Sequence, residues 1–229
     1  MLQDRLKNFG LNDTSLQDLE KYKKMVLDFN TYTNLTSITD DDEFNVKHLL
    51  DCLSIMKSGY VKNSNTIIDV GTGAGFPGMV LKLYDKSLKL TLLDSLNKRI
   101  RFLNSVADEF ALTDVNTIHG RAEEIARGDL RESFDIATSR AVANLRTLLE
   151  YVLPFVKING YFIAMKGPEY VDELKESTNA LKKLGGEVVE IIEVALPMDI
   201  NHFLIIVKKV SSTPKVYPRS GGKPKNKPL

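Results

Sequence analysis

The sequence predicts a doubly wound α/β fold, with a mostly parallel, seven-stranded sheet and a helical extension in front of it. Three observations lead to this prediction. From residue 65 onward, short apolar runs alternate with stretches of helical periodicity. The first of these runs ends in a glycine-rich loop, and the first sixty residues show helical spacing. Strands that alternate with helices form βαβ units, which build a parallel sheet covered by helices on both faces.

The helical extension is expected over residues 1–60. Thr14 and Gln17 have the spacing of a capping box at the start of its first long helix. The apolar residues of that helix recur at helical spacing and are Leu16, Leu19, Tyr22, Val26 and Phe29. Residues 40–43 are all acidic, which favours the start of a second helix because carboxylates stabilise a helix N-terminus. One stripe of this second helix holds Phe44, His48, Cys52 and Ile55.

The sheet is expected over residues 61–210. Its strand candidates are Thr66–Val70, Leu88–Leu93, Val115–Ile118, Phe134–Ala137, Tyr161–Met165, Val188–Val194 and Phe203–Val207. Its helix candidates are Phe76–Leu83, Asn97–Phe110, Asn144–Val156 and Pro168–Leu184. The short connection Pro197–Asp199 suits a hairpin, so an antiparallel strand is expected to close the sheet. Seven strands with this ending match the methyltransferase version of the doubly wound fold.

The composition of the chain excludes several classes of protein. With 229 residues, 43% of them hydrophobic, the chain can bury a core, which excludes wholesale disorder. No apolar run approaches the length of a membrane-spanning helix. The single cysteine, Cys52, excludes an internal disulfide framework and a cysteine-based zinc cage, and we expect no metal. The charged first residues differ from a signal peptide, so we expect a cytoplasmic protein.

Charge is distributed unevenly along the chain. The 31 basic and 30 acidic residues give a net charge of +1, yet residues 208–229 hold seven basic residues and no acidic ones. The preceding part therefore carries 24 basic and 30 acidic residues, a net charge of −6. Residues 211–229 contain four of the eight prolines, which predicts an extended basic tail. Such a tail suits a phosphate backbone, although it can also serve solubility alone.

The most informative motif is the glycine-rich loop of residues 69–78, between the first strand and the first helix of the sheet. Gly71, Gly73 and Gly75 allow a tight turn and the close approach of a ligand to the backbone. The helix that follows can receive a phosphate or carboxylate at its start. No Gly-Lys-Ser/Thr sequence follows, which excludes a P-loop. The alternative is a loop that only packs the strand on the helix.

Two residues of this loop distinguish between nucleotide cofactors. A nicotinamide-binding G-x-G-x-x-G motif that starts at Gly71 requires a glycine where the sequence has Phe76. Asp69, at the end of the strand, suits a ligand that carries an ammonium group beside a carboxylate. The methionine end of S-adenosylmethionine has both groups. The loop therefore favours this cofactor over a nicotinamide dinucleotide.

Further cofactor contacts are expected after the second and third strands. Asp94 follows Gly71 by 23 residues, where a doubly wound domain places the carboxylate that binds ribose hydroxyls. The loop after the third strand borders the adenine in this fold, with the backbone of Ala122 and the side chain of Glu123 at its edge. Taken alone, Asp94 and Glu123 also suit the starts of surface helices.

The fourth strand leads to Arg140, at the crevice where chemistry takes place in this fold. Two signatures are missing there: the Asn/Asp-Pro-Pro-aromatic turn of many amino-group methyltransferases and the cysteine nucleophile of cytosine-C5 methyltransferases. The N7 atom of guanine needs neither, because its lone pair is free at neutral pH and catalysis is largely positioning. Arg140 can bind guanine O6 or the cofactor carboxylate, or form a salt bridge that caps the sheet.

Several short motifs occur together over nearly the whole chain. They are Asn34–Ile38, His48–Asp51, Asp69–Gly78, Leu93–Ser95 with Lys98–Arg99, Arg121–Glu123, Ser139–Ala141, Lys166–Gly167 and Tyr217–Arg219. In combination they resemble the bacterial small-subunit ribosomal RNA guanine-N7 methyltransferase family, also called glucose-inhibited division protein B. The resemblance implies an S-adenosylmethionine-dependent enzyme that methylates N7 of one guanosine in small-subunit (16S) ribosomal RNA. It also implies cofactor contacts at Gly71, Phe76, Ala122, Glu123 and Arg140.

RNA-binding residues are expected mainly in the tail. Tyr217 can stack on a base, and Arg219, Lys223 and Lys225 can bind phosphates. Where the family often has a second basic residue after Arg219, this chain has Ser220, and the two lysines can compensate.

Three further residues are expected near the crevice. Lys166, at the end of the fifth strand, can reach RNA or be a surface charge. His48 and Asp51 share a helix face and either line the guanine crevice or form a buried pair.

We expect a monomer that acts on small-subunit ribosomal RNA or on the assembling subunit. The alternatives are a small-molecule methyltransferase and a non-enzymatic RNA-binding assembly factor, with a nicotinamide oxidoreductase least favoured.

Overall fold

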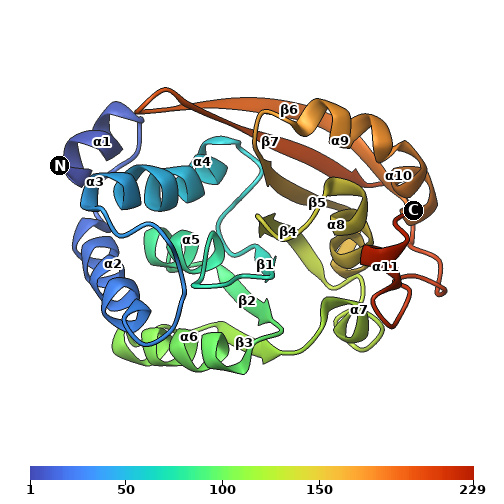
Figure 1. Ribbon diagram of the computed structural model, residues 1–229, viewed down its shortest axis with the longest axis horizontal. Coiled ribbons are helices and arrows are strands. Elements are labelled where there is room, and N and C mark those ends of the chain that lie inside the picture. The colour runs from blue at the N-terminus through green and yellow to red at the C-terminus, as the bar shows by residue number, and fades with distance from the viewer.

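The computed structural model describes residues 1–229. They form one seven-stranded sheet with helices on both faces (Figure 1). The strands are β1 (Thr66–Val70), β2 (Lys89–Asp94), β3 (Val115–His119), β4 (Phe134–Arg140), β5 (Val156–Lys166), β6 (Gly186–Leu196) and β7 (Ile200–Lys209). Their order in the sheet is β3-β2-β1-β4-β5-β7-β6. Strands β1 to β5 pair in parallel, and β7 is antiparallel to both β5 and β6.

The helices precede the sheet, connect its strands and follow it. Before the sheet lie α1 (Leu2–Asn8), α2 (Leu16–Asn30), α3 (Asp41–Phe44) and α4 (Asp51–Lys57), with the π-helical segment Asn45–Leu50 between the last two. The others are α5 (Gly78–Tyr84), α6 (Asn97–Glu109), α7 (Ala122–Ile125), α8 (Leu145–Val152), α9 (Tyr170–Glu176), α10 (Thr178–Leu184) and α11 (Lys223–Asn226). In Figure 1 the blue N-terminal helices and the red C-terminal end lie at opposite sides of the view.

Each face of the sheet has its own hydrophobic core, because successive side chains of a strand point to opposite faces. On β1, Ile67 belongs to the first core and Ile68 to the second. The first core also contains Leu6 of α1 and Leu19 of α2, whereas the second contains Leu148 of α8. The N-terminal helices therefore share a core with the sheet.

All seven predicted strands are present, and the antiparallel pairing of the last two is confirmed. The antiparallel strand does not lie at the edge of the sheet, however. Strand β7 inserts between β5 and β6, so β6 forms the edge. Residues 204–207 of β7 are all buried, as a strand covered on both faces requires, whereas much of β6 is exposed.

Two predicted helices are shorter than expected. The helix predicted over residues 144–156 ends earlier because Pro154 cannot continue it, and Val156 already belongs to β5. The helix predicted over residues 168–184 is broken at Ser177 into α9 and α10.

The two helices predicted in the N-terminal extension begin in different ways. The predicted capping box of Thr14 and Gln17 is wrong, because no side chain caps α2 and the Thr14 hydroxyl bonds to Asn12 instead. The acidic start of the second helix is confirmed. The carboxylate of Asp40 accepts a hydrogen bond from the backbone N–H of Glu43 at 2.9 Å, which is the geometry of an N-cap.

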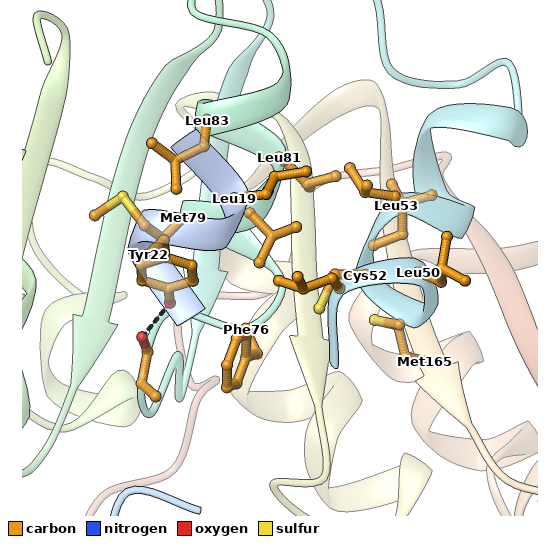
Figure 2. Packing of buried hydrophobic residues seen from close by; sticks show 14 of the residues in the cluster. Leu19, Tyr22, Leu50, Cys52, Leu53, Phe76, Met79, Leu81, Leu83 and Met165 are labelled. Atoms are coloured by element: carbon orange, nitrogen blue, oxygen red, sulfur yellow. Dashed lines mark hydrogen bonds between the residues drawn. The ribbon is translucent and has the colours of Figure 1, made fainter. Parts of the chain in front are cut away.

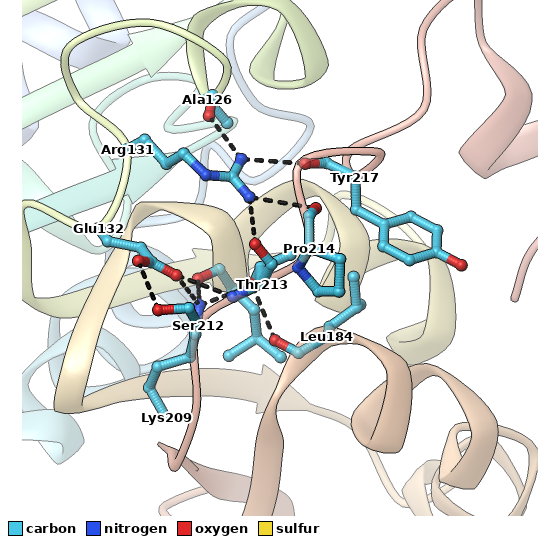
Figure 3. A network of polar contacts seen from close by, with 10 residues as sticks. Ala126, Arg131, Glu132, Leu184, Lys209, Ser212, Thr213, Pro214 and Tyr217 are labelled. Atoms are coloured by element: carbon cyan, nitrogen blue, oxygen red, sulfur yellow. Dashed lines mark hydrogen bonds and ion pairs between the residues drawn. The ribbon is translucent and has the colours of Figure 1, made fainter.

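The sequence predicted an extended basic tail over residues 211–229, and the structure shows that this segment is docked on the protein. Figure 3 shows the contacts of its first residues. Arg131 donates to the backbone carbonyl of Thr213 at 2.6 Å. Lys209 is fully buried, donates to the Thr213 hydroxyl at 2.7 Å and forms an ion pair with Glu132. Glu132 in turn accepts the backbone N–H of Thr213 at 2.8 Å. These contacts fix the start of the tail.

Two residues of the tail that were predicted to bind RNA have contacts within the protein. The Tyr217 ring packs against the second core. The Arg219 guanidinium contacts both carboxylate oxygens of Glu150, which is fully buried, at 2.7 to 3.2 Å. The docking was not predicted because Glu150 lies far away in the sequence. The exposed basic residues of the tail are Lys215, Lys223, Lys225 and Lys227.

No helix combines the length and the apolar character that crossing a bilayer requires. The structure contains no group of three or more His, Cys, Asp or Glu side chains placed to hold a metal ion. Cys52 is a free, buried thiol within the first core.

We predict that Arg219→Met destabilises the fold. The change leaves the Glu150 carboxylate buried without its cation, which costs about 3 kcal/mol of the free energy of unfolding. Urea denaturation measures this cost, with Lys215→Met as a matched control because Lys215 is an exposed basic residue of the same tail. An equal stability of the two variants would contradict the docked position of the tail.

Candidate active site

The glycine-rich loop leaves β1 after Val70 and leads into α5 at Gly78. Gly71 and Gly75 have φ angles of +72° and +105°, a region that favours glycine. A Cβ atom at Gly75 would lie 2.6 Å from the hydroxyl of Tyr22. The loop therefore needs glycine for its conformation and also for the close packing of α2 against it.

Helix α2 supports the loop directly. Tyr22 is fully buried and donates a hydrogen bond from its hydroxyl to the backbone carbonyl of Ala74 (Figure 2). Its ring also meets Phe76 edge to face, with 6.0 Å between the ring centroids. The N-terminal helices thus help to hold the loop backbone in position.

Asp69 lies behind the loop and has no exposed surface. Its carboxylate accepts hydrogen bonds from the Thr72 hydroxyl at 2.6 Å, the Gly78 N–H at 2.9 Å and the Thr138 hydroxyl at 3.2 Å. Burial raises the pKa of Asp69 to about 6, and the hydrogen bonds oppose that shift. The structure corrects the expectation that this carboxylate faces a ligand: it joins β1, the loop, α5 and β4.

A cavity of about 160 Å³ lies over the loop, at the carboxyl ends of β1, β2 and β3. Gly71, Asp94, Ala122 and Glu123 line it, so the structure brings these four predicted residues together. The backbone N–H of Gly73 donates to the Asp94 carboxylate at 2.9 Å, which fixes the loop to the end of β2.

Both carboxylates of this cavity can accept further hydrogen bonds. Asp94 accepts two backbone N–H groups and one from Arg99, which leaves one of about four acceptor positions. Glu123 is only 5% exposed, and its carboxylate forms one ion pair, with the guanidinium of Arg121 at 3.8 Å. No hydrogen bond within the protein reaches the Glu123 carboxylate. A buried carboxylate in this state requires donors from a ligand or water.

The remaining wall of this cavity is largely apolar. Val70 and Leu93 contribute from the strands, while Val142 and Tyr151 come from the segment after β4 and from α8. No sequence motif marks Val142 or Tyr151, and only the fold brings them here. Apolar walls with two carboxylates at the rim fit an adenine ring and ribose hydroxyls.

A second cavity of about 790 Å³ adjoins the first, and Val142 lines both. Arg140 forms part of its wall. The guanidinium donates from Nη1 to the backbone carbonyl of Lys47 at 2.8 Å and to Asp51 Oδ2 at 2.9 Å, and from Nη2 to His48 Nδ1 at 3.0 Å. Three of its five N–H donors are therefore used within the protein.

Phe76 lies beside this arginine. The His48 ring stacks on Phe76 with 4.4 Å between centroids, and the Arg140 guanidinium carbon lies 5.0 Å from the centre of the Phe76 ring. This distance is typical of a cation–π contact. Phe76 thus connects the glycine-rich loop to the wall of the larger cavity, although it is buried and lines neither cavity itself.

The hydrogen bonds of His48 define its protonation state. Arg140 can only donate, so Nδ1 of His48 accepts and Nε2 carries the proton. That proton lies toward the Thr36 hydroxyl oxygen, at 2.7 Å. Burial and the neighbouring arginine lower the pKa of His48 to about 3. His48 and Asp51 both line the larger cavity, yet each is paired with Arg140 and they form no His–Asp pair.

Lys166, a predicted RNA-binding residue, also lines the larger cavity. Its ammonium group lies 2.6 Å from Glu173 and 2.7 Å from the backbone carbonyl of Ala143, and the side chain is only 9% exposed. Two residues of this cavity were not predicted from the sequence: Glu173 of α9 and His202 of β7. In the sequence, His202 is recognisable only as a polar residue directly before the predicted strand Phe203–Val207.

The strand order and the helices on both faces of the sheet are those of the class I methyltransferase fold. Solved structures share this fold. The YcgJ protein of Bacillus subtilis has a TM-score of 0.55 and 16% identity over 72% of this chain and 100% of that chain. A SAM-dependent methyltransferase of Aquifex aeolicus has a TM-score of 0.55 and 20% identity over 75% of this chain and 94% of that one.

The family model for rRNA small subunit methyltransferase G matches residues 15–201. Proteins named ribosomal RNA small subunit methyltransferase G are close in sequence. The one from Alkaliphilus metalliredigens is 52% identical over 96% of this chain and 93% of its own length. The one from Thermoanaerobacter sp. is 47% identical over 100% and 97%. The chain therefore belongs to the rRNA small subunit methyltransferase G family.

We predict that Glu123→Ala weakens binding of S-adenosylmethionine. Loss of a hydrogen bond to a charged group raises the dissociation constant about tenfold or more. Isothermal titration calorimetry measures it. Glu124→Ala is the matched control, since Glu124 is the exposed neighbour on the same short helix. Equal affinities of the two variants would place the adenosine elsewhere.

Proposed function

We propose that this protein transfers a methyl group from S-adenosylmethionine to N7 of one guanosine in small-subunit ribosomal RNA. The observation that carries the proposal is the pair of adjoining cavities at the carboxyl ends of the strands. The smaller one presents the carboxylates of Asp94 and Glu123 beside apolar side chains, which suits the hydroxyls and base of a nucleoside, and the larger one has room for a purine base. Membership of a family named for small-subunit rRNA methylation supports the RNA substrate.

When bound, S-adenosylmethionine would supply an electrophilic methyl group to the N7 lone pair, with the carbon–sulfur electron pair left on sulfur and the positive charge passed to the purine. No proton leaves N7, so no residue need act as a general base. His48 agrees with this, because both of its ring nitrogens are engaged within the protein. The protein contributes mainly by orienting the two reactants.

Residues from three strand ends are proposed to hold the cofactor. Asp94 and Glu123 accept hydrogen bonds from the nucleoside, and the backbone at Gly71, Gly73 and Ala122 lies against it. Gly75 and Phe76 act on the shape of the loop. Arg140 acts as a positioning residue, because it lines the larger cavity and only three of its five N–H donors are used within the protein.

The residues proposed to bind RNA differ in whether their side chains are free or already paired within the protein. Lys223 and Lys225 are exposed on the docked tail and are available for phosphates. Lys166, Tyr217 and Arg219 already have partners within the protein, so any contact with RNA requires those partners to be exchanged. We also propose that the protein acts as a monomer in the cytoplasm, on free rRNA or on the assembling subunit.

The function is tested by mapping methylation. Purified protein and labelled S-adenosylmethionine are incubated with unmodified small subunits and with naked rRNA, and 7-methylguanosine is located by reductive cleavage of the RNA chain. We expect one guanosine to be modified. Cofactor binding without any transfer to either substrate would instead favour a non-enzymatic assembly factor.

We predict that Lys223→Gln/Lys225→Gln weakens RNA binding and flattens its salt dependence. Each lost phosphate contact lowers the slope of log K against log salt by about 0.7 for single-stranded RNA. Filter binding over a range of salt concentrations measures the slope. Lys62→Gln/Lys89→Gln is the matched control, because both lysines are exposed near the amino ends of the strands. An unchanged slope would remove the tail from the RNA-binding surface.

A further inference from the structure

His202 lies on β7 and its side chain, 31% exposed, lines the larger cavity. Its Nδ1 atom is 2.8 Å from Oδ1 of Asp51, whose other oxygen bonds to Arg140. Arg140 is a permanent cation, so Asp51 is held as a carboxylate and can only accept hydrogen bonds. The proton between Asp51 and His202 therefore lies on Nδ1 of His202.

The other ring nitrogen of His202 has a different environment. Nε2 has no hydrogen-bond partner within the protein, and in the neutral ring it carries a lone pair. His48, the second histidine of the cavity, has both nitrogens engaged. His202 is therefore the histidine of this cavity that can still bind a ligand.

We propose that His202 is a specificity residue whose Nε2 atom accepts a hydrogen bond from the N–H edge of the target guanine. The inference rests on the proposed function and extends it to base recognition. Guanine presents neighbouring N1–H and amino donors on one edge, whereas adenine presents an acceptor at N1. This edge lies opposite N7, so a base held by His202 keeps N7 free to face the cofactor.

The charge change of the reaction favours this arrangement. Methylation at N7 places a positive charge on the purine, which makes its N–H groups stronger donors. An acceptor backed by the carboxylate of Asp51 stabilises that charge as it develops. A protonated His202 would instead place a second positive charge beside the base.

Two charged groups face His202 from neighbouring elements: Asp51 from α4 and Arg140 from β4. The other ionisable residues that line the cavity are Lys47, His48, Lys166 and Glu173. The hydrogen bond to Asp51 raises the pKa of His202 above its ordinary value, while burial and Arg140 oppose the shift. As the pH falls through this raised pKa, Nε2 gains a proton and loses its acceptor lone pair. Methyl transfer is therefore expected to fall on the acid side.

The experiment measures kcat and KM for methylation of small subunits over a range of pH by the wild type, His202→Gln and His202→Ala. Glutamine keeps an acceptor oxygen but does not titrate. We expect His202→Ala to lower kcat/KM about tenfold near neutral pH. His202→Gln should retain most of the activity and lose the acid limb that belongs to His202. Asn201→Ala, an exposed residue of the same strand, is the matched control.

Cofactor affinity, measured by calorimetry, should be unchanged in all of these variants. An acid limb that persists in His202→Gln, or an unaltered rate in His202→Ala, would overturn the role of His202. A wild-type protein that methylates no guanosine would instead refute the proposed function, before any His202 variant is compared.

Discussion

The hydrogen bonds of Arg140 connect the two halves of the candidate site. This arginine ends β4, and its guanidinium is bound by the backbone of Lys47, by His48 and by Asp51, all from the helical segment before the sheet. Asp51 in turn holds His202 from β7. A nearly buried arginine needs these acceptors, so the N-terminal helices are fixed against the carboxyl ends of the strands, where the larger cavity lies. The π-helical turn, Asn45–Leu50, falls at this contact, as such turns often do at functional sites.

The glycine-rich loop is held from several sides. Asp69 fixes the loop through hydrogen bonds from Thr72 and Gly78 and is itself held by Thr138 of β4. Asp94 binds the N–H of Gly73, and Tyr22 binds the carbonyl of Ala74. A loop that depends on positive φ angles would otherwise have many conformations. Its backbone is thereby preorganised, which lowers the entropy lost when a ligand binds.

The docked tail has a structural consequence for the smaller cavity. Helix α8 carries Glu150, which binds Arg219, and the adjacent Tyr151, which lines that cavity. The charge of Arg219 is thus used to satisfy a buried carboxylate and to hold α8, while the exposed lysines of the tail remain for other partners. The basic residues of this segment therefore fall into two groups, one paired within the protein and one exposed, which composition alone does not separate.

The succession of strands and helices, the glycine-rich loop and the places of Asp94 and Glu123 could be predicted from the sequence, because periodicity and turn chemistry act over a few residues. The contacts between groups that lie far apart in the chain could not be predicted, because they form only when the chain folds. The pairs Arg219–Glu150 and His202–Asp51 join residues 69 and 151 positions apart, and no local pattern records such pairs. For the same reason the burial of Asp69 and the order of β6 and β7 became visible only in the folded sheet, where burial on both faces decides each position.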